Sequence, residues 1–301
     1  MAVRVNEAVD PDALWQKGKV FINRALAAKD NAAFDEAGVW GASALELLGK
    51  AALSAINPLL IADPSDDGKS LLIAAGVSKD TQGFRAVQAK TVFSRCARAF
   101  PSFNEREAGL IAGNRNEELH SGTTPFQDLH EDSWWERYWA QAAVLVAAQG
   151  KTVEALVGRK HAEEIEAYLA RNAENIQRRV AASIERARQH FEQLAAAIGG
   201  GTLMPTLPAA SGVFEFEHEE ECPACESPGL LLGDYVGSSD IQYDADDGYP
   251  TEYLVVYAGE FACPYCGLHL QGSEALAAAA LPEHFDVERE AEPDWDDYGN
   301  D

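Results

Sequence analysis

The sequence predicts a mainly α-helical bundle that ends in a long helix and is followed by a small β domain. From about residue 11 to 151, apolar residues recur at three- and four-residue steps, which is the period of amphipathic helices. Beyond residue 213, apolar and polar residues alternate as they do in half-buried strands. Residues 1–200 carry 23 Lys and Arg against 26 Asp and Glu, whereas residues 201–301 carry 1 against 23. This change in charge indicates a domain boundary near residue 200.

We expect the helical bundle within residues 1–152. Breaks are predicted at Asn57-Pro58, Asp63–Gly68 and Gly122–Pro125, where Pro, Gly and Asp favour turns. In the second helix, Leu45, Leu48 and Ala52 share one apolar stripe, and Glu46 stands one turn before Lys50. The predicted helices lie near 11–28, 32–55, 84–99, 103–119 and 131–149.

A single long helix is predicted over residues 153–198. Its apolar residues recur about every 3.7 positions, which is closer to a straight helix than to a left-handed coiled coil. These apolar side chains must be buried, either against the bundle itself or against a second chain. Gly199–Gly201 should end the helix, and residues 199–212 read as a linker rich in Gly and Pro.

The β domain is expected over residues 213–275, with strands at Val213–His218 and Tyr253–Tyr257. Residues 233–250 are acidic and rich in Gly and Ser, so we expect an exposed loop there. Residues 276–301 are expected to form an acidic tail, with little regular structure from 283 onward.

Two Cys-x-x-Cys pairs, Cys222/Cys225 and Cys263/Cys266, predict a structural zinc site. Each pair places two sulfur atoms in one tight turn, and two such turns supply the four tetrahedral ligands of a closed zinc shell. Disulfides or a redox function explain the repeated motif less well. The fifth cysteine, Cys96, is expected to be a buried thiol within a helix.

The cysteine pattern resembles a zinc ribbon. The two pairs are separated by 37 residues, against about 15–20 in the commoner arrangement. We therefore expect an insertion between them, with the acidic segment 233–250 as its candidate. His218 and His269 lie near the pairs as further candidate ligands.

The hexapeptide Arg115–His120 places a fixed cation and an imidazole five residues apart. Residues five apart on a helix are separated by about 140°, so they do not share one face. Gly113 before the motif and Gly122 after it suggest a helix start, with Asn114 or Asn116 as its cap. An alternative interpretation is purely structural, with Arg115 paired to Glu117, Glu118 or another carboxylate.

The motif Arg115-Asn116-Glu-Glu-Leu-His120 resembles the signature of the HEPN superfamily, Arg-x(4–6)-His with Asn after the Arg. The run Leu45–Lys50 is similar to an earlier helix of that family, in which an acidic residue and a lysine recur. The resemblance implies an all-α domain that dimerises to bring two Arg/His pairs into one cleft. It also implies a metal-independent endoribonuclease of the kind found in bacterial toxin and antiviral-defence systems.

The resemblance gives each motif residue a role. His120 would take the proton of a ribose 2′-hydroxyl or protonate the leaving 5′-oxygen. Arg115 would stabilise the charge on the phosphorus oxygens, and Asn116 would orient the histidine or bind phosphate. RNA is then the substrate and the catalytic step needs no cofactor.

The N-terminus lacks the apolar run of a signal peptide, and no uncharged apolar stretch reaches the roughly 18 residues of a membrane span. We therefore expect a cytoplasmic protein without membrane contact. Arg289 is the one basic residue of 201–301, so this end should repel nucleic acid and suits a basic protein partner.

Three alternatives remain for the acidic end. The protein could be a catalytically silent HEPN-like adaptor that displays an acidic zinc ribbon. The acidic end could instead occupy the RNA site of its own or a neighbouring subunit, or simply be a solvated surface.

Overall fold

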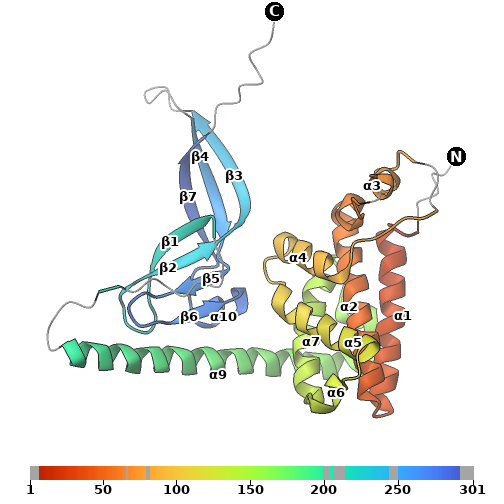
Figure 1. Cartoon of the computed structure of the whole chain (residues 1–301), viewed down its shortest axis with the longest axis horizontal. Helices are drawn as coiled ribbons and strands as arrows, with labels where there is room; N and C mark the ends of the chain where they lie inside the picture. The colour runs from red at the N-terminus through yellow and green to blue at the C-terminus, as the bar shows by residue number, and fades with distance from the viewer. Residues whose placement is uncertain are drawn as a thin grey trace, which may run out of the picture. The chain divides into compact units, whose positions relative to one another are not determined.

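The computed structural model describes residues 7–65, 67–78, 82–198, 204–205, 214–243 and 250–291. It consists of two compact units, residues 1–174 and 175–301. The first unit is helical, and the second contains antiparallel strands together with the last part of the longest helix (Figure 1). This arrangement confirms the predicted fold class of a mainly helical part with a long helix followed by a small β region.

The helices of the first unit are short to medium in length, apart from α9, which continues into the second unit. Their bounds are Pro11–Asp30 (α1), Phe34–Ile56 (α2), Pro58–Ile61 (the 3₁₀ helix η1), Lys69–Ala74 (α3), Ala89–Ala99 (α4), Glu105–His120 (α5), Pro125–Asp128 (α6), Glu131–Ala147 (α7), Val153–Val157 (α8) and Arg159–Ile198 (α9).

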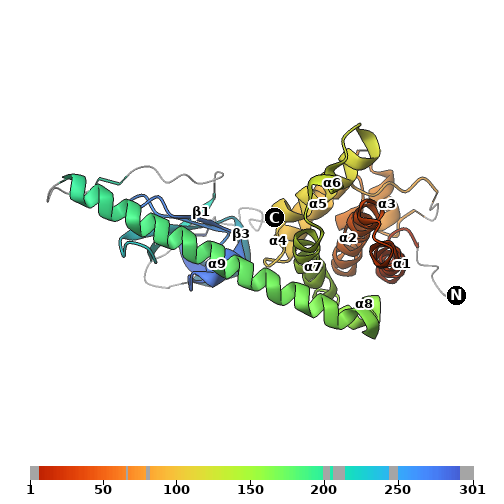
Figure 2. The same cartoon turned by 90° about the horizontal axis from the view of Figure 1, so that it is seen from below.

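Helix α2 is the central helix of the bundle and contacts α1, α4, α5 and α7. Figure 2 shows α1, α2 and α7 side by side. Small residues permit this close packing: a Cβ added to Gly41 would lie 2.9 Å from the ring of Trp134, and one added to Gly49 would lie 2.9 Å from Val92. By length and composition α2 could also cross a membrane, but 56% of its apolar window is buried inside the bundle.

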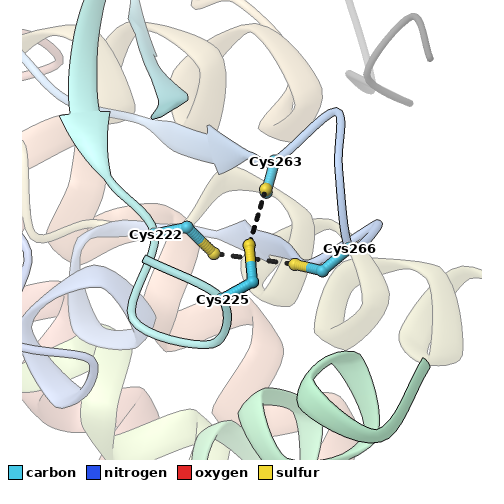
Figure 3. A group of neighbouring side chains, drawn as sticks. All are labelled: Cys222, Cys225, Cys263 and Cys266. Atoms are coloured by element: carbon cyan, nitrogen blue, oxygen red, sulfur yellow. Dashed lines mark hydrogen bonds between the residues drawn. The ribbon is translucent and has the colours of Figure 1, made fainter. Parts of the chain in front are cut away.

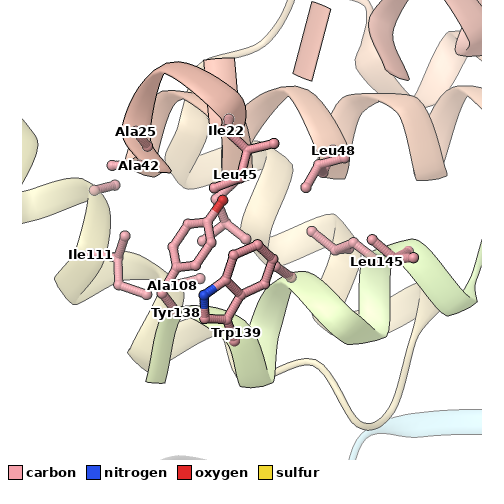
Figure 4. Close-up of a cluster of buried hydrophobic side chains, with 14 of the residues drawn as sticks. Ile22, Ala25, Ala42, Leu45, Leu48, Ala108, Ile111, Tyr138, Trp139 and Leu145 are labelled. Carbon is pink, nitrogen blue, oxygen red and sulfur yellow. The ribbon is translucent and has the colours of Figure 1, made fainter. Parts of the chain in front are cut away.

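The core between α2 and α7 is built on aromatic side chains. Trp134, Trp135, Tyr138 and Trp139 are fully buried, and Trp134 stacks on Tyr138 with a ring-centroid distance of 5.3 Å. Figure 4 shows Tyr138 and Trp139 among aliphatic side chains of α1, α2 and α5. Burying each large apolar side chain contributes about 1.5–3 kcal/mol, so this cluster contributes substantially to the stability of the unit.

Three predicted helix boundaries were wrong. Residues 84–88 are not helical, because Ala86 pairs with Ala62 in an isolated antiparallel bridge and α4 begins only at Ala89. The predicted helix 153–198 is interrupted at Gly158, whose φ of +79° is incompatible with a continuous right-handed helix. Helix α5 passes through Gly113 without a break, so the hexapeptide lies at a helix end rather than at a helix start.

The β unit contains two antiparallel sheets. The first has the strand order β1-β2-β5-β6 and the second the order β3-β4-β7 (Figure 1). The bounds are Phe216–Glu221 (β1), Pro228–Gly233 (β2), Tyr235–Tyr243 (β3), Pro250–Tyr257 (β4), Glu260–Ala262 (β5), His269–Gln271 (β6) and His284–Glu290 (β7), with a short helix at Ser273–Ala278 (α10).

Two segments expected to lack structure contain strands. Strand β3 lies within the predicted loop 233–250, and β7 lies within the predicted acidic tail 276–301. Both strands pair with β4, so the apolar residues Phe285 and Val287 lie opposite Val256 and Leu254. Pairing with β4 therefore overrides the acidic composition. The predicted linker 199–212 lies outside the described residues, apart from 204 and 205.

The apolar stripe of α9 is covered within each unit. In the helical unit, Ile165 and Tyr168 are buried in the core, and Arg171 forms a 2.8 Å ion pair with the buried Glu136 of α7. In the β unit, Val180 and Ala187 are buried in a second core that also contains the cysteines. These four apolar residues of α9 are thus buried by other residues of the same chain.

Candidate functional site

The two cysteine pairs lie in equivalent turns of the first sheet. Cys222 and Cys225 occupy the turn between β1 and β2, and Cys263 and Cys266 occupy the turn between β5 and β6. Because β2 pairs with β5, these two turns come together at one end of the sheet (Figure 3). The 37 residues between the pairs contain β2 and β5 of this sheet and, between those two strands, β3 and β4 of the second sheet. Strands β3 and β4 are thus the insertion that the spacing predicted.

Both turns close in the same way. The backbone N–H of Glu226 donates to the carbonyl of Cys222 at 2.9 Å, and that of Gly267 donates to the carbonyl of Cys263 at 3.1 Å. The donor residue is left-handed in each case, with φ of +57° at Glu226 and +74° at Gly267. Glycine adopts this conformation without strain and glutamate does not, so only the second turn has the favourable residue.

The four sulfur atoms have the spacing of a tetrahedral metal site. All lie within 4.8 Å of one another, and the Sγ–Sγ distances Cys222–Cys266 and Cys225–Cys263 are both 3.6 Å (Figure 3). Ligands at the usual Zn–S distance of about 2.3 Å would be about 3.8 Å apart along a tetrahedron edge. The donor set therefore fits Zn²⁺ without rearrangement of the turns.

The electrostatics of the cluster favour a bound cation. Hydrogen bonds from the thiols of Cys222 and Cys266 lower the pKa of Cys263 well below its ordinary value. Hydrogen bonds with Cys222 and Cys263 raise the pKa of Cys266, and the hydrogen bond with Cys263 raises the pKa of Cys222. Three of the four cysteines are buried, and a buried thiolate needs a compensating positive charge. Four thiolates would fill the zinc shell, so the ion would stabilise the fold and leave no position for a substrate.

The two histidines near the cysteines have other contacts. The ring of His218 stacks on Phe285 at a centroid distance of 5.5 Å, and Nε2 of His269 lies 2.8 Å from Oε2 of Glu260. Among the described residues, the cluster of metal-ligand type contains the four cysteines alone. Neither histidine belongs to it.

Cys96 is a buried thiol on α4. Its side chain has no exposed surface, and its Sγ lies 3.8 Å from the carbonyl oxygen of Gly49. Burial raises the pKa of Cys96 to about 12, so the thiol stays protonated and unreactive at neutral pH.

The Arg115 guanidinium is held by two oxygen-bearing side chains. Its Nη1 donates to Oε2 of Glu46 at 2.9 Å, and its Nε and Nη2 donate to Oδ1 of Asn116 at 3.2 and 3.0 Å. The other carboxylate oxygen of Glu46 accepts a bond from Nζ of Lys50 at 2.7 Å. One carboxylate of α2 therefore orients cations from two helices.

The charge of Glu46 is stabilised at this position. Burial opposes its ionisation, but the charges and hydrogen bonds of Lys50 and Arg115 outweigh burial and lower the pKa of Glu46 below its ordinary value. The Arg115 and Lys50 side chains are only 16% and 14% exposed. The pairing is therefore more than a mobile surface contact. The carboxylate partner of Arg115 is Glu46, which agrees with the structural interpretation that Arg115 pairs with Glu117, Glu118 or another carboxylate.

His120 lies outside this network. It is the last residue of α5 and is exposed, and no hydrogen bond or ion pair joins its ring to another described residue. The cap of α5 is Asn104, whose side chain accepts from the backbone N–H of Glu107 at 3.1 Å, so neither Asn114 nor Asn116 caps the helix. The structure thus brings Arg115, Asn116, Glu46 and Lys50 together but leaves His120 separate.

Comparison of the chain with models of known protein families, with curated proteins and with solved structures finds no match.

Proposed function

We propose that the helical unit is a HEPN-type ribonuclease that cleaves RNA without a catalytic metal, and that the β unit is a zinc ribbon that docks or senses a partner. The observation that carries the proposal is the orientation of Arg115. Glu46 and Asn116 hold its guanidinium near the end of α5, in the same two turns that end with the exposed His120. A toxin or antiviral-defence role follows from the resemblance of the motif.

The proposed reaction needs a proton acceptor, a proton donor and a cation. His120 takes the proton of the 2′-hydroxyl, whose oxygen forms a bond to phosphorus while the bond to the 5′-oxygen breaks. Arg115 stabilises the charge on the two non-bridging oxygens. A proton returned to the 5′-oxygen completes the step and leaves a 2′,3′-cyclic phosphate and a 5′-hydroxyl.

The proposed chemistry calls for a second copy of the chain. Five residues on a helix correspond to a rise of about 7.5 Å and a rotation of about 140°, so Arg115 and His120 of one chain point in different directions. In a homodimer, two copies of the motif would face one phosphodiester from opposite sides. One histidine would then act as the base and the other as the acid.

The test is cleavage of mixed cellular RNA in buffer free of added divalent metal. A chelator is unsuitable here, because it would also remove a structural zinc ion. Arg115→Ala and His120→Ala should each lower the rate by about 100-fold or more, with 2′,3′-cyclic phosphate ends formed only by active protein. Arg98→Ala and His130→Ala remove exposed side chains of the same types and should leave the rate unchanged.

Intact RNA with the folded wild-type protein would refute the ribonuclease. Equal loss in the control variants would show that cleavage does not depend on the motif.

A second candidate function is a non-enzymatic adaptor that binds a basic protein. The exposed glutamates of the edge strand β1, which are Glu217, Glu219 and Glu221, favour this function. Residues 201–301, which include β1, carry one basic residue. Capture of a Lys/Arg-rich partner should weaken with salt and with charge reversal of these glutamates, and be unaffected by His120→Ala. Capture that persists after charge reversal would exclude this surface.

A further inference from the structure

The β unit contains a cavity that does not share its acidic character. It has a volume of about 320 Å³ and lies between one face of α9 and the turn that follows Cys266. Its lining contains no Asp or Glu, although residues 201–301 carry 23 of them. The lining residues are Ser183, Arg186, Ala187 and His190 from α9, and Cys266, Gly267, Leu268 and His269 from the β region.

Arg186 is the cation that lines this open pocket, and it is an exposed residue. Its Nε donates to the carbonyl of Ala182 at 3.2 Å and its Nη2 donates to Oγ of Ser183 at 3.1 Å. No carboxylate among the described residues lies within ion-pair distance of it. By contrast, Arg188 on the same helix is paired with Glu185 at 3.0 Å. The guanidinium of Arg186 is thus oriented by its own helix and keeps N–H groups for a ligand.

Two imidazoles complete the polar lining. Nδ1 of His190 lies 3.1 Å from the carbonyl oxygen of Cys266, and Nε2 of His269 lies 2.8 Å from the carboxylate of Glu260. Each ring therefore has one nitrogen fixed by the protein and a second nitrogen without a partner among the described residues. The two rings come from different elements, one from α9 and one from β6.

These groups select a particular class of anion. A carboxylate ligand is fully ionised at neutral pH and only accepts hydrogen bonds. A phosphate monoester has its second pKa near 6, so it can either accept a hydrogen bond from an imidazole or donate its own P–OH proton to one. It therefore offers charged oxygens that accept from Arg186 and, as the monoanion, one P–OH group that donates to a single ring nitrogen.

The apolar lining is restricted to Ala187 and Leu268, together with Gly267 and the buried Cys266. This leaves little surface for stacking a base or an aromatic group. Gly267 also has open space around the position of a Cβ. The volume is near the lower end of small-molecule pockets, about 300–1,000 Å³, so a compact ligand fits best.

We propose that this cavity binds a phosphate monoester, with Arg186, His190 and His269 as its binding residues. The site is independent of the proposed ribonuclease, since none of its residues belongs to the helical unit. The ligand is either free inorganic phosphate or a small organic phosphate ester.

Isothermal titration calorimetry of the full-length, zinc-loaded protein tests the proposal. The probes are inorganic phosphate and adenosine 5′-monophosphate, with dimethyl phosphate as a diester control and acetate as a carboxylate control. We expect both monoesters to bind and both controls to bind at least ten-fold more weakly. Tighter binding of adenosine monophosphate would identify an organic ester, and tighter binding of inorganic phosphate the free anion.

The matched variants are Arg186→Gln and Arg188→Gln, which make the same charge change two positions apart on α9. Losing a charged hydrogen-bonding partner should weaken monoester binding about ten- to a hundred-fold in Arg186→Gln, and Arg188→Gln should bind like the wild type. Zinc content verifies the fold of each variant, and His190→Gln replaces Arg186→Gln if the latter loses zinc.

Equal weakening in the two arginine variants would overturn the site, because it would indicate a general charge effect. The proposal also fails if acetate or the diester binds as tightly as the monoesters. Absence of binding of either monoester to the wild-type protein at about 10 mM ligand, ten-fold above a millimolar Kd, would refute the proposal outright.

Discussion

Removal of zinc should unfold the β unit while the helical unit stays folded. The four cysteines tie together two turns, and the strands that adjoin the second turn, β5 and β6, are only three residues long. Zinc binding contributes about 10–16 kcal/mol in small zinc-dependent peptides, against about 5–15 kcal/mol for the total stability of a typical domain. The free energy lost with the ion is therefore larger than the remaining contacts of this unit can offset.

The tryptophans allow the two units to be followed separately. Five of the six, at positions 15, 40, 134, 135 and 139, lie in the helical unit, and Trp295 lies outside the described residues. After chelation, the tryptophan fluorescence and the denaturant midpoint of the helical unit should be unchanged. Amide protection in β1, β2, β5 and β6 should be lost, as hydrogen exchange measures.

Two variants complete the zinc experiment. Cys263→Ser should lower the zinc content below one ion per chain, and Cys96→Ala should not, because Cys96 lies outside the cluster. Full protection of the β strands after complete removal of zinc would refute the structural role of the ion. Joint loss of fluorescence and β protection would show instead that the two units unfold together.

Three further predictions concern stability. Because the pKa of Glu46 is lowered in the folded protein, its contribution is present above its ordinary value of 4.5 and is lost as the pH falls through the folded value. Glu46→Gln should thus cost about 1–3 kcal/mol at pH 7 and much less in acid, and an equal cost at both pH values would contradict the pairing. The hydroxyl of Tyr138 is buried and has no hydrogen-bond partner among the described residues, so Tyr138→Phe should be neutral or stabilising by up to about 1 kcal/mol in urea unfolding; a loss of stability above about 1 kcal/mol would reveal a hydrogen-bond partner. Glu226→Gly should raise the midpoint for unfolding of the β unit by removing left-handed strain of about 1 kcal/mol, and a lower midpoint would show that the strain is absent.

The cysteine cluster and the fold class could be predicted because their signals are local. A Cys-x-x-Cys pair closes within a single turn, and the change from helical to alternating periodicity is visible over a few residues. Strand β7 lacked such a signal, since it has only Phe285 and Val287 as apolar residues among charged ones. It becomes a strand because β4 offers Val256 and Leu254 opposite these positions, and that partner lies about thirty residues earlier in the chain.

The contact of Arg115 with Glu46 could not be predicted from local sequence signals either. The sequence pointed to Glu46 and Lys50 as a pair one turn apart, which is local, and to Arg115 as part of a separate motif. Their contact joins residues 69 positions apart and depends on the packing of α2 against α5. Gly113 predicts a helix start next to the motif, but the Asn104 cap determines where α5 begins, so the motif lies at the end of the helix.

Helix α9 explains why composition and packing place the boundary between the two parts differently. The net charge changes near residue 200, where the linker was expected. The compact units instead divide within α9, between residues 174 and 175. The apolar stripe is continuous in the sequence, but Tyr168 is buried in the helical core and Val180 in the β core. A periodic stripe records that a surface is buried and not which partner buries it, so a domain boundary inside a continuous helix leaves no mark in the sequence pattern.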